Sequence, residues 1–98
     1  MNKQEQKVFT VCLEGDLDHH NAPKLRRKIE EECCGKQFDV LVLDFSRISF
    51  MDSSGIGLVL SKFQQLKNQG KELQVKGATG KVLKIFELST VTKIITFM

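Results

Sequence analysis

The chain of 98 residues contains no tryptophan, no tyrosine and a single proline. It therefore lacks two of the aromatic side chains on which nucleic-acid-binding proteins stack bases, and its seven phenylalanines fall at positions typical of a core. A chain this short closes one core and has little material for a second. With 41% apolar residues, the composition is that of a folded domain and not of a disordered tail. We expect one globular domain that binds no nucleic acid.

Cysteines and long apolar runs are also few. The three cysteines include the adjacent pair Cys33 and Cys34, which matches neither a disulfide framework nor a C-x-x-C metal or redox motif. No run approaches the roughly 20 apolar residues that span a bilayer. Residues 1–7 also lack the apolar stretch of a secretion signal. These absences predict a reduced, cytoplasmic setting and no contact with a membrane.

Neither sign of charge dominates. The net charge of +3 comes from 15 basic and 12 acidic residues mixed along the chain, and the basic residues 26–28 are followed after Ile29 by the acidic residues 30–32. Such mixing is typical of a solvated helix face and not of a nucleic-acid-binding stripe. The weak positive balance favours an acidic protein partner.

Hydrophobic periodicity predicts strands and helices in alternation. Residues 39–45 form a nearly continuous apolar run, the pattern of a strand buried on both faces of a sheet. Residues 56–67 keep apolar side chains at helical spacing, with Gly70 as the stop, and Asn21 and Thr79 are predicted N-caps of the helices before and after. The order is typical of a small α/β domain with a mixed, mostly parallel sheet and helices packed on it. The predicted strands are residues 8–13, 39–45, 72–76 and 93–97, and the predicted helices are residues 22–34, 56–67 and 82–86.

Two polar stretches invite a catalytic or metal-binding interpretation that their spacing does not support. Residues 77–82 hold two glycines and a lysine, but Val82 stands where a phosphate loop needs the hydroxyl that binds magnesium. Residues 16–20 hold two aspartates and two histidines, but a second ligand pair at a recognisable distance is missing. A helix start and a solvated turn are the better predictions.

The stretch SFMDSSGIG, residues 49–57, places an acid and two hydroxyls between a predicted strand and a predicted helix. The α/β folds usually place their sites at this end of a strand. A hydrolase nucleophile requires G-x-S-x-G, which neither Ser53 nor Ser54 satisfies, and the two histidines lie in another turn. An acyl-transfer enzyme is therefore the weaker alternative. We predict that one of the two hydroxyls caps the helix, while Gly55 and Gly57 permit close packing.

A phosphorylation switch is compatible with such a cap. A phosphoryl group adds about −1.5 to −2 charges at pH 7, and a helix N-terminus offers free amides and a positive dipole to receive it. The fold would survive, while the added charge beside Asp52 would repel a partner that fits the neutral hydroxyl. The residues alone do not decide which serine would be modified.

Three segments together resemble one known family. They are GDLDHH at residues 15–20, LDF at residues 43–45 and SFMDSSGIG at residues 49–57. With them the chain resembles, over nearly its whole length, the anti-sigma-factor antagonists of the STAS family, and most closely those of the sporulation (sigma-F) type. The resemblance implies one STAS-type domain over residues 1–98.

The resemblance also implies a non-enzymatic regulator that is controlled by phosphorylation. Unphosphorylated antagonist binds a partner that is both anti-sigma factor and serine kinase, and so releases the sigma factor. The kinase then phosphorylates the antagonist with ATP held in the kinase, and a metal-dependent serine phosphatase resets it. The antagonist would need no cofactor, and we expect a monomer. The alternative is a stress-response antagonist, or another STAS adaptor, with a different kinase.

Carried over residue by residue, the resemblance implies that Ser53 is phosphorylated and that Asp52 serves recognition and phosphorylation. It leaves Ser54 as the helix cap. The rest of the implied partner-binding face consists of Gly55, Asp16, Asp18 and His19.

The chain departs from the family in one respect. Family members usually continue past the last strand into another helix, whereas this sequence stops at Phe97 and Met98. We therefore expect a STAS domain without the C-terminal helix and without the contacts that helix would make.

Overall fold

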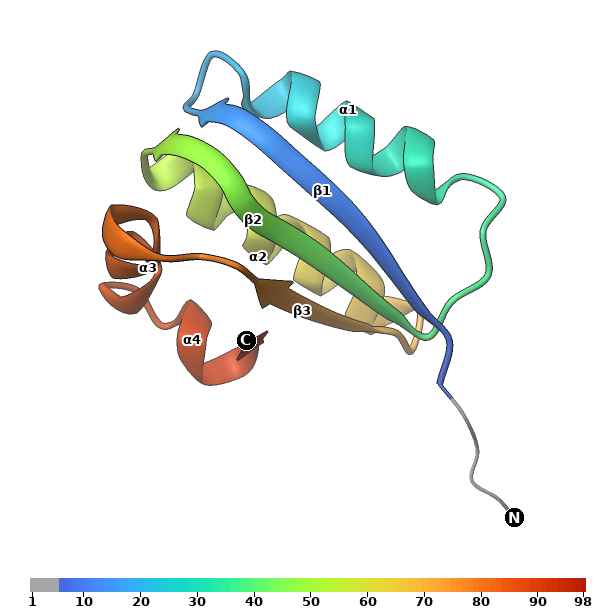
Figure 1. Cartoon of the computed structure of the whole chain (residues 1–98). Helices are drawn as coiled ribbons and strands as arrows, with labels where there is room; N and C mark the ends of the chain where they lie inside the picture. Colours follow the sequence, from blue (N-terminus) through green and yellow to red (C-terminus); the bar gives the residue numbers. More distant parts are fainter. Residues whose placement is uncertain (1–5) are drawn as a thin grey trace.

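The computed structural model describes residues 6–98 as helices packed on a four-stranded sheet (Figure 1). Within this range none of the helices has the length and apolar character that crossing a membrane requires. In chain order the elements are β1 (Val8–Leu17), α1 (Ala22–Cys33), β2 (Val40–Met51), α2 (Ser53–Asn68), β3 (Glu72–Lys76), α3 (Gly80–Glu87), α4 (Val91–Ile94) and β4 (Thr96–Phe97).

The sheet is parallel throughout the described residues, which refines the predicted mixed, mostly parallel sheet. The strand order is β1-β2-β3-β4, and each neighbouring pair runs parallel. Because this order follows the chain without reversing, successive crossovers of one hand return on the same face of the sheet. In agreement with this, α1 packs against β1, α2 packs against β3, and α1 contacts α2. The α/β class predicted from the sequence is confirmed.

The core lies between this face of the sheet and the helices. Leu41, Leu43 and Phe45 alternate along β2 and belong to one buried cluster. The ring of Phe45 meets that of Phe86 edge-on, with ring centroids 5.3 Å apart. Phe86 packs in turn against Phe97 of β4 at 5.0 Å, so the short last strand is held by aromatic contacts as well as by pairing with β3.

Strand β2 is central, and it runs past its neighbour β3. Its first four residues are at most 4% exposed, so the predicted burial of this strand on both faces is confirmed. Pairing with β3 covers only residues 40–44, whereas pairing with β1 continues to Met51. Past Asp44 the register with β1 shifts twice, and residues 46–50 are mostly exposed. These shifts break the alternation of apolar and polar residues, which is why the sequence predicted an end at residue 45.

The other boundaries agree with prediction where the pattern is strong. Strand β3 coincides with the predicted residues 72–76, while β1 continues beyond residue 13 because it follows the long β2. The predicted strand at residues 93–97 is mostly wrong. Residues 91–94 form the short helix α4, and only Thr96–Phe97 pair as a strand.

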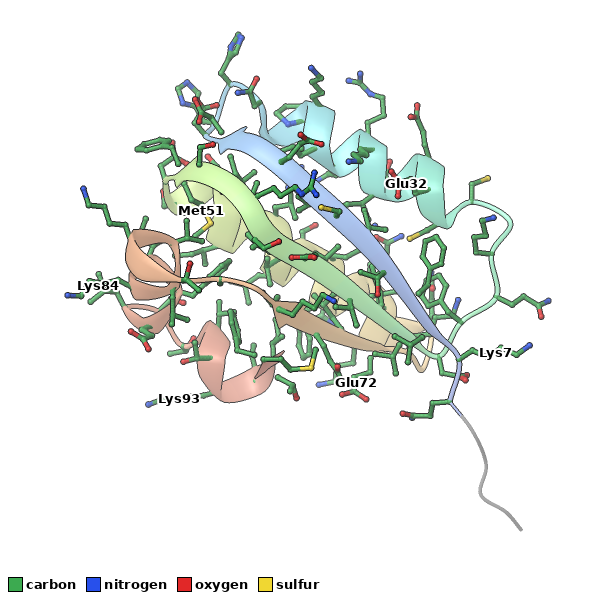
Figure 2. The ribbon with its side chains drawn as sticks, viewed as in Figure 1. Lys7, Glu32, Met51, Glu72, Lys84 and Lys93 are labelled. Carbon is green, nitrogen blue, oxygen red and sulfur yellow. The ribbon has the colours of Figure 1, made fainter. Side chains whose placement is uncertain are left out.

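Gly55 sets how closely α2 approaches the end of β2. A Cβ atom at this position would overlap Cγ and Sδ of Met51 and would lie 3.2 Å from Cδ2 of Leu17. Met51, seen at the end of β2 in Figure 2, is 3% exposed and belongs to the core, so it has little room to move. A Cβ at Gly57 meets nothing within 4 Å. The predicted need for close packing therefore holds at Gly55 and not at Gly57.

We expect Gly55→Ala and Gly57→Ala to change stability in opposite directions. The methyl at Gly55 crowds Met51 and lowers the free energy of unfolding by about 1–3 kcal/mol, less the gain in helix propensity. The methyl at exposed Gly57 adds only the propensity gain of about 0.5–1 kcal/mol. Urea denaturation of both variants beside the wild type measures the difference. Equal changes in the two variants would contradict the assigned contact.

Candidate functional site

Asp52 occupies the junction between β2 and α2 and starts the helix. Its backbone is extended, with φ −111° and ψ −167°, and its Oδ1 accepts a hydrogen bond from the backbone N–H of Ser54 at 2.8 Å. These are the conformation and the bond of an N-cap residue. The prediction that a serine hydroxyl, that of Ser54, caps this helix is therefore wrong. The helix begins at Ser53 and not near residue 56, so the capping position falls at Asp52, ahead of both serines.

The two serines differ in their surroundings. Ser53 is the first residue of α2 and is exposed, and within the described chain no hydrogen bond is recorded for its hydroxyl. Ser54 is half-buried, and its backbone N–H is used by Asp52. The backbone N–H of Gly55 donates to the Asp52 carbonyl at 3.0 Å, which closes the first turn. Ser53 therefore presents the more accessible hydroxyl.

The turn after β1 is attached to the same aspartate. The backbone N–H of His19 donates to Oδ2 of Asp52 in a long hydrogen bond of 3.4 Å, and the N–H of Asp52 donates to the Leu17 carbonyl at 3.2 Å. Asp16 pairs in register with Phe50, two residues before Asp52. The structure thus brings residues 16–19 next to the start of α2, as the resemblance to the family implied.

Asp18 has a structural task within that turn. Its Oδ1 accepts a hydrogen bond from the backbone N–H of Asn21 at 2.8 Å, and its carbonyl accepts from the N–H of Ala22 at 2.8 Å. Asn21 stands at the N-cap position of α1, as predicted, but its side chain makes no capping bond. Thr79 likewise stands at the N-cap position of α3, as predicted, and its side chain makes no capping bond either. In α1 the aspartate orders the helix start because it precedes the cap in a tight turn.

Phe50 is the residue at this surface that sequence reasoning missed. Its ring is 54% exposed, whereas the neighbouring Met51 is 3% exposed. The expectation that all the phenylalanines belong to the core is therefore wrong. The signal was available in the strand alternation, since the residue before a buried Met51 points to the opposite face. The second register shift, between Gly15 and Asp16, obscures that alternation in the sequence.

The electrostatics of Asp52 suit a fixed anion and not a general base. The hydrogen bond from the Ser54 backbone N–H holds the pKa of the Asp52 carboxyl below its ordinary value of 3.8, against the opposing effect of burial, and the Ser54 hydroxyl and His19 lower it further by lesser amounts. A carboxylate of low pKa that already accepts two N–H groups is a poor proton acceptor near neutral pH. Both histidines are exposed. Among residues 6–98, the His, Cys, Asp and Glu side chains form no group of three or more that could hold a metal ion.

The sheet also lacks the crevice that α/β enzymes use. Such crevices open where the strand order reverses, and here the order runs from β1 to β4 without reversal. Ser53 and Phe50, on either side of the end of β2, are both exposed. Both side chains are therefore accessible to a larger molecule.

We expect Asp52→Asn to flatten the dependence of stability on acid pH. Because the pKa of Asp52 is lowered in the folded state, its contribution to stability is present above the ordinary value of 3.8 and is lost as the pH falls through the lowered value. Asparagine also caps helices well, so stability at pH 7 changes little. The loss of unfolding free energy between pH 7 and pH 3 should therefore be smaller in the variant than in the wild type.

Asp44→Asn provides the matched comparison, since the Ser46 backbone N–H lowers the pKa of Asp44 at a different place on β2. It should reduce the acid loss as well, and the double variant should show both effects added. An unchanged profile in Asp52→Asn would contradict the assigned bond between Asp52 and the Ser54 N–H.

The chain has recognisable relatives. A model of the STAS domain family matches residues 1–98. The chain is 32% identical over 87 residues to the anti-sigma F factor antagonist of Paenibacillus polymyxa, and the aligned region covers 89% of this chain and 74% of that protein. It is 29% identical over 95 residues to the anti-sigma-B factor antagonist of Listeria monocytogenes, and that alignment covers 97% of this chain and 82% of the relative.

Solved structures agree with this match. The anti-sigma factor antagonist SpoIIAA in its unphosphorylated form superposes with a TM-score of 0.74 at 28% identity, over 99% of this chain and 84% of that one. The phosphorylated form of the Bacillus protein superposes with a TM-score of 0.66 at 27% identity, over 99% and 87%. Since the family model spans all 98 residues, the resemblance inferred from the sequence is confirmed, and the chain belongs to the STAS domain family.

Proposed function

We propose that this chain is an anti-sigma-factor antagonist whose activity is controlled by phosphorylation of Ser53. The unphosphorylated form binds an anti-sigma factor that is also a serine kinase, and the sigma factor is released. The observation that carries the proposal is the exposed Ser53 hydroxyl on the first turn of α2, next to the capping carboxylate of Asp52. The names of the two relatives, each an antagonist of an anti-sigma factor, support the same class of function.

Ser53 is favoured over Ser54 as the acceptor because a kinase must reach the hydroxyl. Ser53 is exposed, whereas Ser54 is half-buried and held to Asp52 through its backbone N–H. The hydroxyl of Ser53 has no recorded partner within residues 6–98, so transfer of a phosphoryl group breaks no internal hydrogen bond there. Asp52 lies beside it and stays ionised near neutral pH, which suits a role in orienting the acceptor for the kinase.

Phosphorylation would act on the partner's affinity and leave the fold in place. A phosphoserine at a helix N-terminus lies where the dipole is positive, so the added charge of about −1.5 to −2 is tolerated. On the outer surface the same charge adds to that of the Asp52 carboxylate, two residues after Phe50, whose ring is 54% exposed. A partner that packs against that ring would have to desolvate the new anion, which is unfavourable.

The turn after β1 completes the proposed binding face. His19 and Asp16 are exposed, and the hydrogen bond from His19 to Asp52 ties the turn to the start of α2. Asp18 contributes by ordering the turn through its bond to Asn21, and Gly55 contributes by letting α2 approach Met51. We assign direct contact with the partner to Asp16, His19, Phe50 and Ser53.

The remaining parts of the cycle belong to other proteins. The kinase supplies ATP, so the chain itself needs no cofactor and acts as a regulator and not as an enzyme. A metal-dependent serine phosphatase returns it to the active form, and the setting is the cytoplasm. The segment GDLDHH at residues 15–20 favours the sporulation type over a stress-response antagonist, and the monomeric state stays a prediction.

The first test is phosphorylation by an anti-sigma serine kinase of the sigma-F type. Intact-mass and peptide mass spectrometry should show one phosphoryl group on Ser53 in the wild type and in Ser54→Ala, and none in Ser53→Ala. A kinase of the sigma-B type, run in parallel, decides between the sporulation and stress-response assignments by its relative rate. A phosphoryl group mapped to Ser54, or no modification by either kinase, would rule out the proposed switch.

The second test separates charge from fold. Ser53→Asp should keep the melting temperature within a few degrees, because an anion is tolerated at the helix start, and should weaken binding to the kinase by roughly tenfold or more. Ser61→Asp is the control, since Ser61 is exposed on the same helix two turns away. Calorimetric titration of each variant against the kinase measures the effect. Equal affinities for Ser53→Asp and the wild type would place the binding face elsewhere.

A further inference from the structure

A pocket lies at the opposite end of the sheet from Ser53. Both α1 and α2 run back from the carboxyl ends of β1 and β2, so their C-terminal ends lie near the start of β2 (Figure 1). Between these ends the side chains leave a hollow of about 290 Å³. Its apolar lining is formed by Phe38, Leu41 and Leu66, which are 7%, 0% and 4% exposed.

Lys62 lines this pocket and is buried, and none of the charged groups in residues 6–98 forms an ion pair with it. It is 6% exposed and is the one buried polar or charged residue in the described part of the chain. Its Nζ donates to Oε1 of Gln65 at 3.0 Å, and Gln65 lines the pocket too. An ammonium group has three donors, and this neutral acceptor satisfies one of them. For residues 6–98 the only recorded ion pair joins Lys28 to Glu32, so no carboxylate neutralises Lys62.

Such a position is costly for the fold of the free protein. Burial of a charge is unfavourable unless an opposite charge and hydrogen bonds compensate for it. Lys62 lies on the inner face of α2 between Leu58 and Leu66, both at most 4% exposed, where an apolar side chain would continue the packing. An anion in the pocket would compensate for this charge.

Two more lysines give the pocket a positive rim. Lys36 and Lys71 line it, and Nζ of Lys71 lies 4.3 Å from the centroid of the Phe38 ring. Burial raises the pKa of the Cys33 thiol, and so does the nearby charge of Glu32, while the charges of Lys62 and Lys71 lower it. Among the described residues Glu30 is the one carboxylate in the lining, so the three lysines leave a net positive charge.

We propose that this pocket binds a small organic anion, a carboxylate or a phosphate monoester with an apolar body. The anionic group meets Lys62 and Lys71, and the body covers Phe38, Leu41 and Leu66. If each non-hydrogen atom takes about the share of volume that a water molecule has, the hollow accommodates roughly ten such atoms. The site is separate from Ser53, so its occupancy does not depend on the proposed phosphorylation.

Phenyl phosphate is a suitable probe, because it combines an anion with an aromatic body of about that size. Titrated into the ¹⁵N-labelled chain, it should cause saturable shifts in the amide signals of residues 33–41 and 62–71. The variant Lys62→Met should weaken the affinity by roughly tenfold or more, since a hydrogen bond to a charged group is lost. Lys67→Met, an exposed position on the same helix outside the pocket lining, should keep the wild-type affinity.

Three further probes test the chemistry of the ligand. Benzoate should bind at the same residues, because the carboxylate replaces the phosphate. Benzyl alcohol, which lacks the charge, and inorganic phosphate, which lacks the body, should each bind more weakly than phenyl phosphate. Equal affinity for benzyl alcohol and phenyl phosphate, shifts centred on residues 52–55, or unchanged affinity in Lys62→Met would overturn the proposal.

Stability and thiol reactivity supply readouts that do not depend on NMR. Without ligand, Lys62→Met should melt about 4 °C or more above the wild type, because an uncompensated buried charge is removed. Phenyl phosphate should slow alkylation of Cys33 and Cys34, which line the pocket, and should leave Cys12 on β1 unaffected. A lower melting temperature in Lys62→Met would mean that the lysine stabilises the free fold, and the anion would then not be needed.

Discussion

The proposed binding face depends on the two hydrogen bonds that the carboxylate of Asp52 accepts. One oxygen accepts the Ser54 N–H and so decides where α2 begins, and the other accepts the His19 N–H from the turn after β1. Two segments that are far apart in the sequence are thereby held at one edge of the sheet. The same bonds favour the ionised carboxyl, because each donates to the charged form. Position of the helix start, exposure of Ser53 and placement of the turn thus share one physical cause.

The unequal pairing on the two sides of β2 explains why the carboxyl end of this strand is exposed. Strand β3 pairs with β2 only as far as Asp44, while β1 accompanies β2 to Met51. Within the described residues the last part of β2 therefore pairs with a strand on one side only, and two shifts of register interrupt that pairing. Because the order of the described strands does not reverse, this end of the sheet has no switch point of the kind at which α/β enzymes open their crevice. Phe50 and Ser53 are both exposed here, so a protein partner can reach them.

The sequence predicted those parts of the fold in which one periodicity is unbroken. Residues 72–76 form β3 as expected, and the buried run at residues 39–45 became the central strand. The failures have definite causes. Aspartate and serine are comparable N-caps, so composition alone could not choose Asp52 over the serines. The short helix α4 has too few residues for a helical period to be recognised.

The two residues that the sequence did not reveal have a cause in common. Assigning the phenylalanines to the core missed Phe50, and nothing in the apolar spacing of residues 56–67 marked Lys62 as buried, because residue type alone is a poor guide to burial at a single position. For Phe50 the register shifts of β1 and β2 decide the direction of the ring. For Lys62 the helix phase decides it, since Leu58 and Leu66 lie four residues away on either side of it and are buried. Phase and register are properties of the packed structure, and a single sequence gives them only where its pattern is regular.

The two ends of the sheet handle charge in opposite ways. At the start of α2 a phosphoryl group on Ser53 would remain in water and next to a positive dipole, so it would change what the surface can bind without lowering the stability of the fold. At the other end of the sheet, Lys62 carries its charge inside the protein with one neutral acceptor. An anion in that pocket would stabilise the native state in proportion to its concentration, because it binds the folded chain and not the unfolded one. In these two proposals a phosphoryl group on Ser53 would act on partner affinity and a pocket ligand would act on the stability of the domain, so the protein could respond to each without the other.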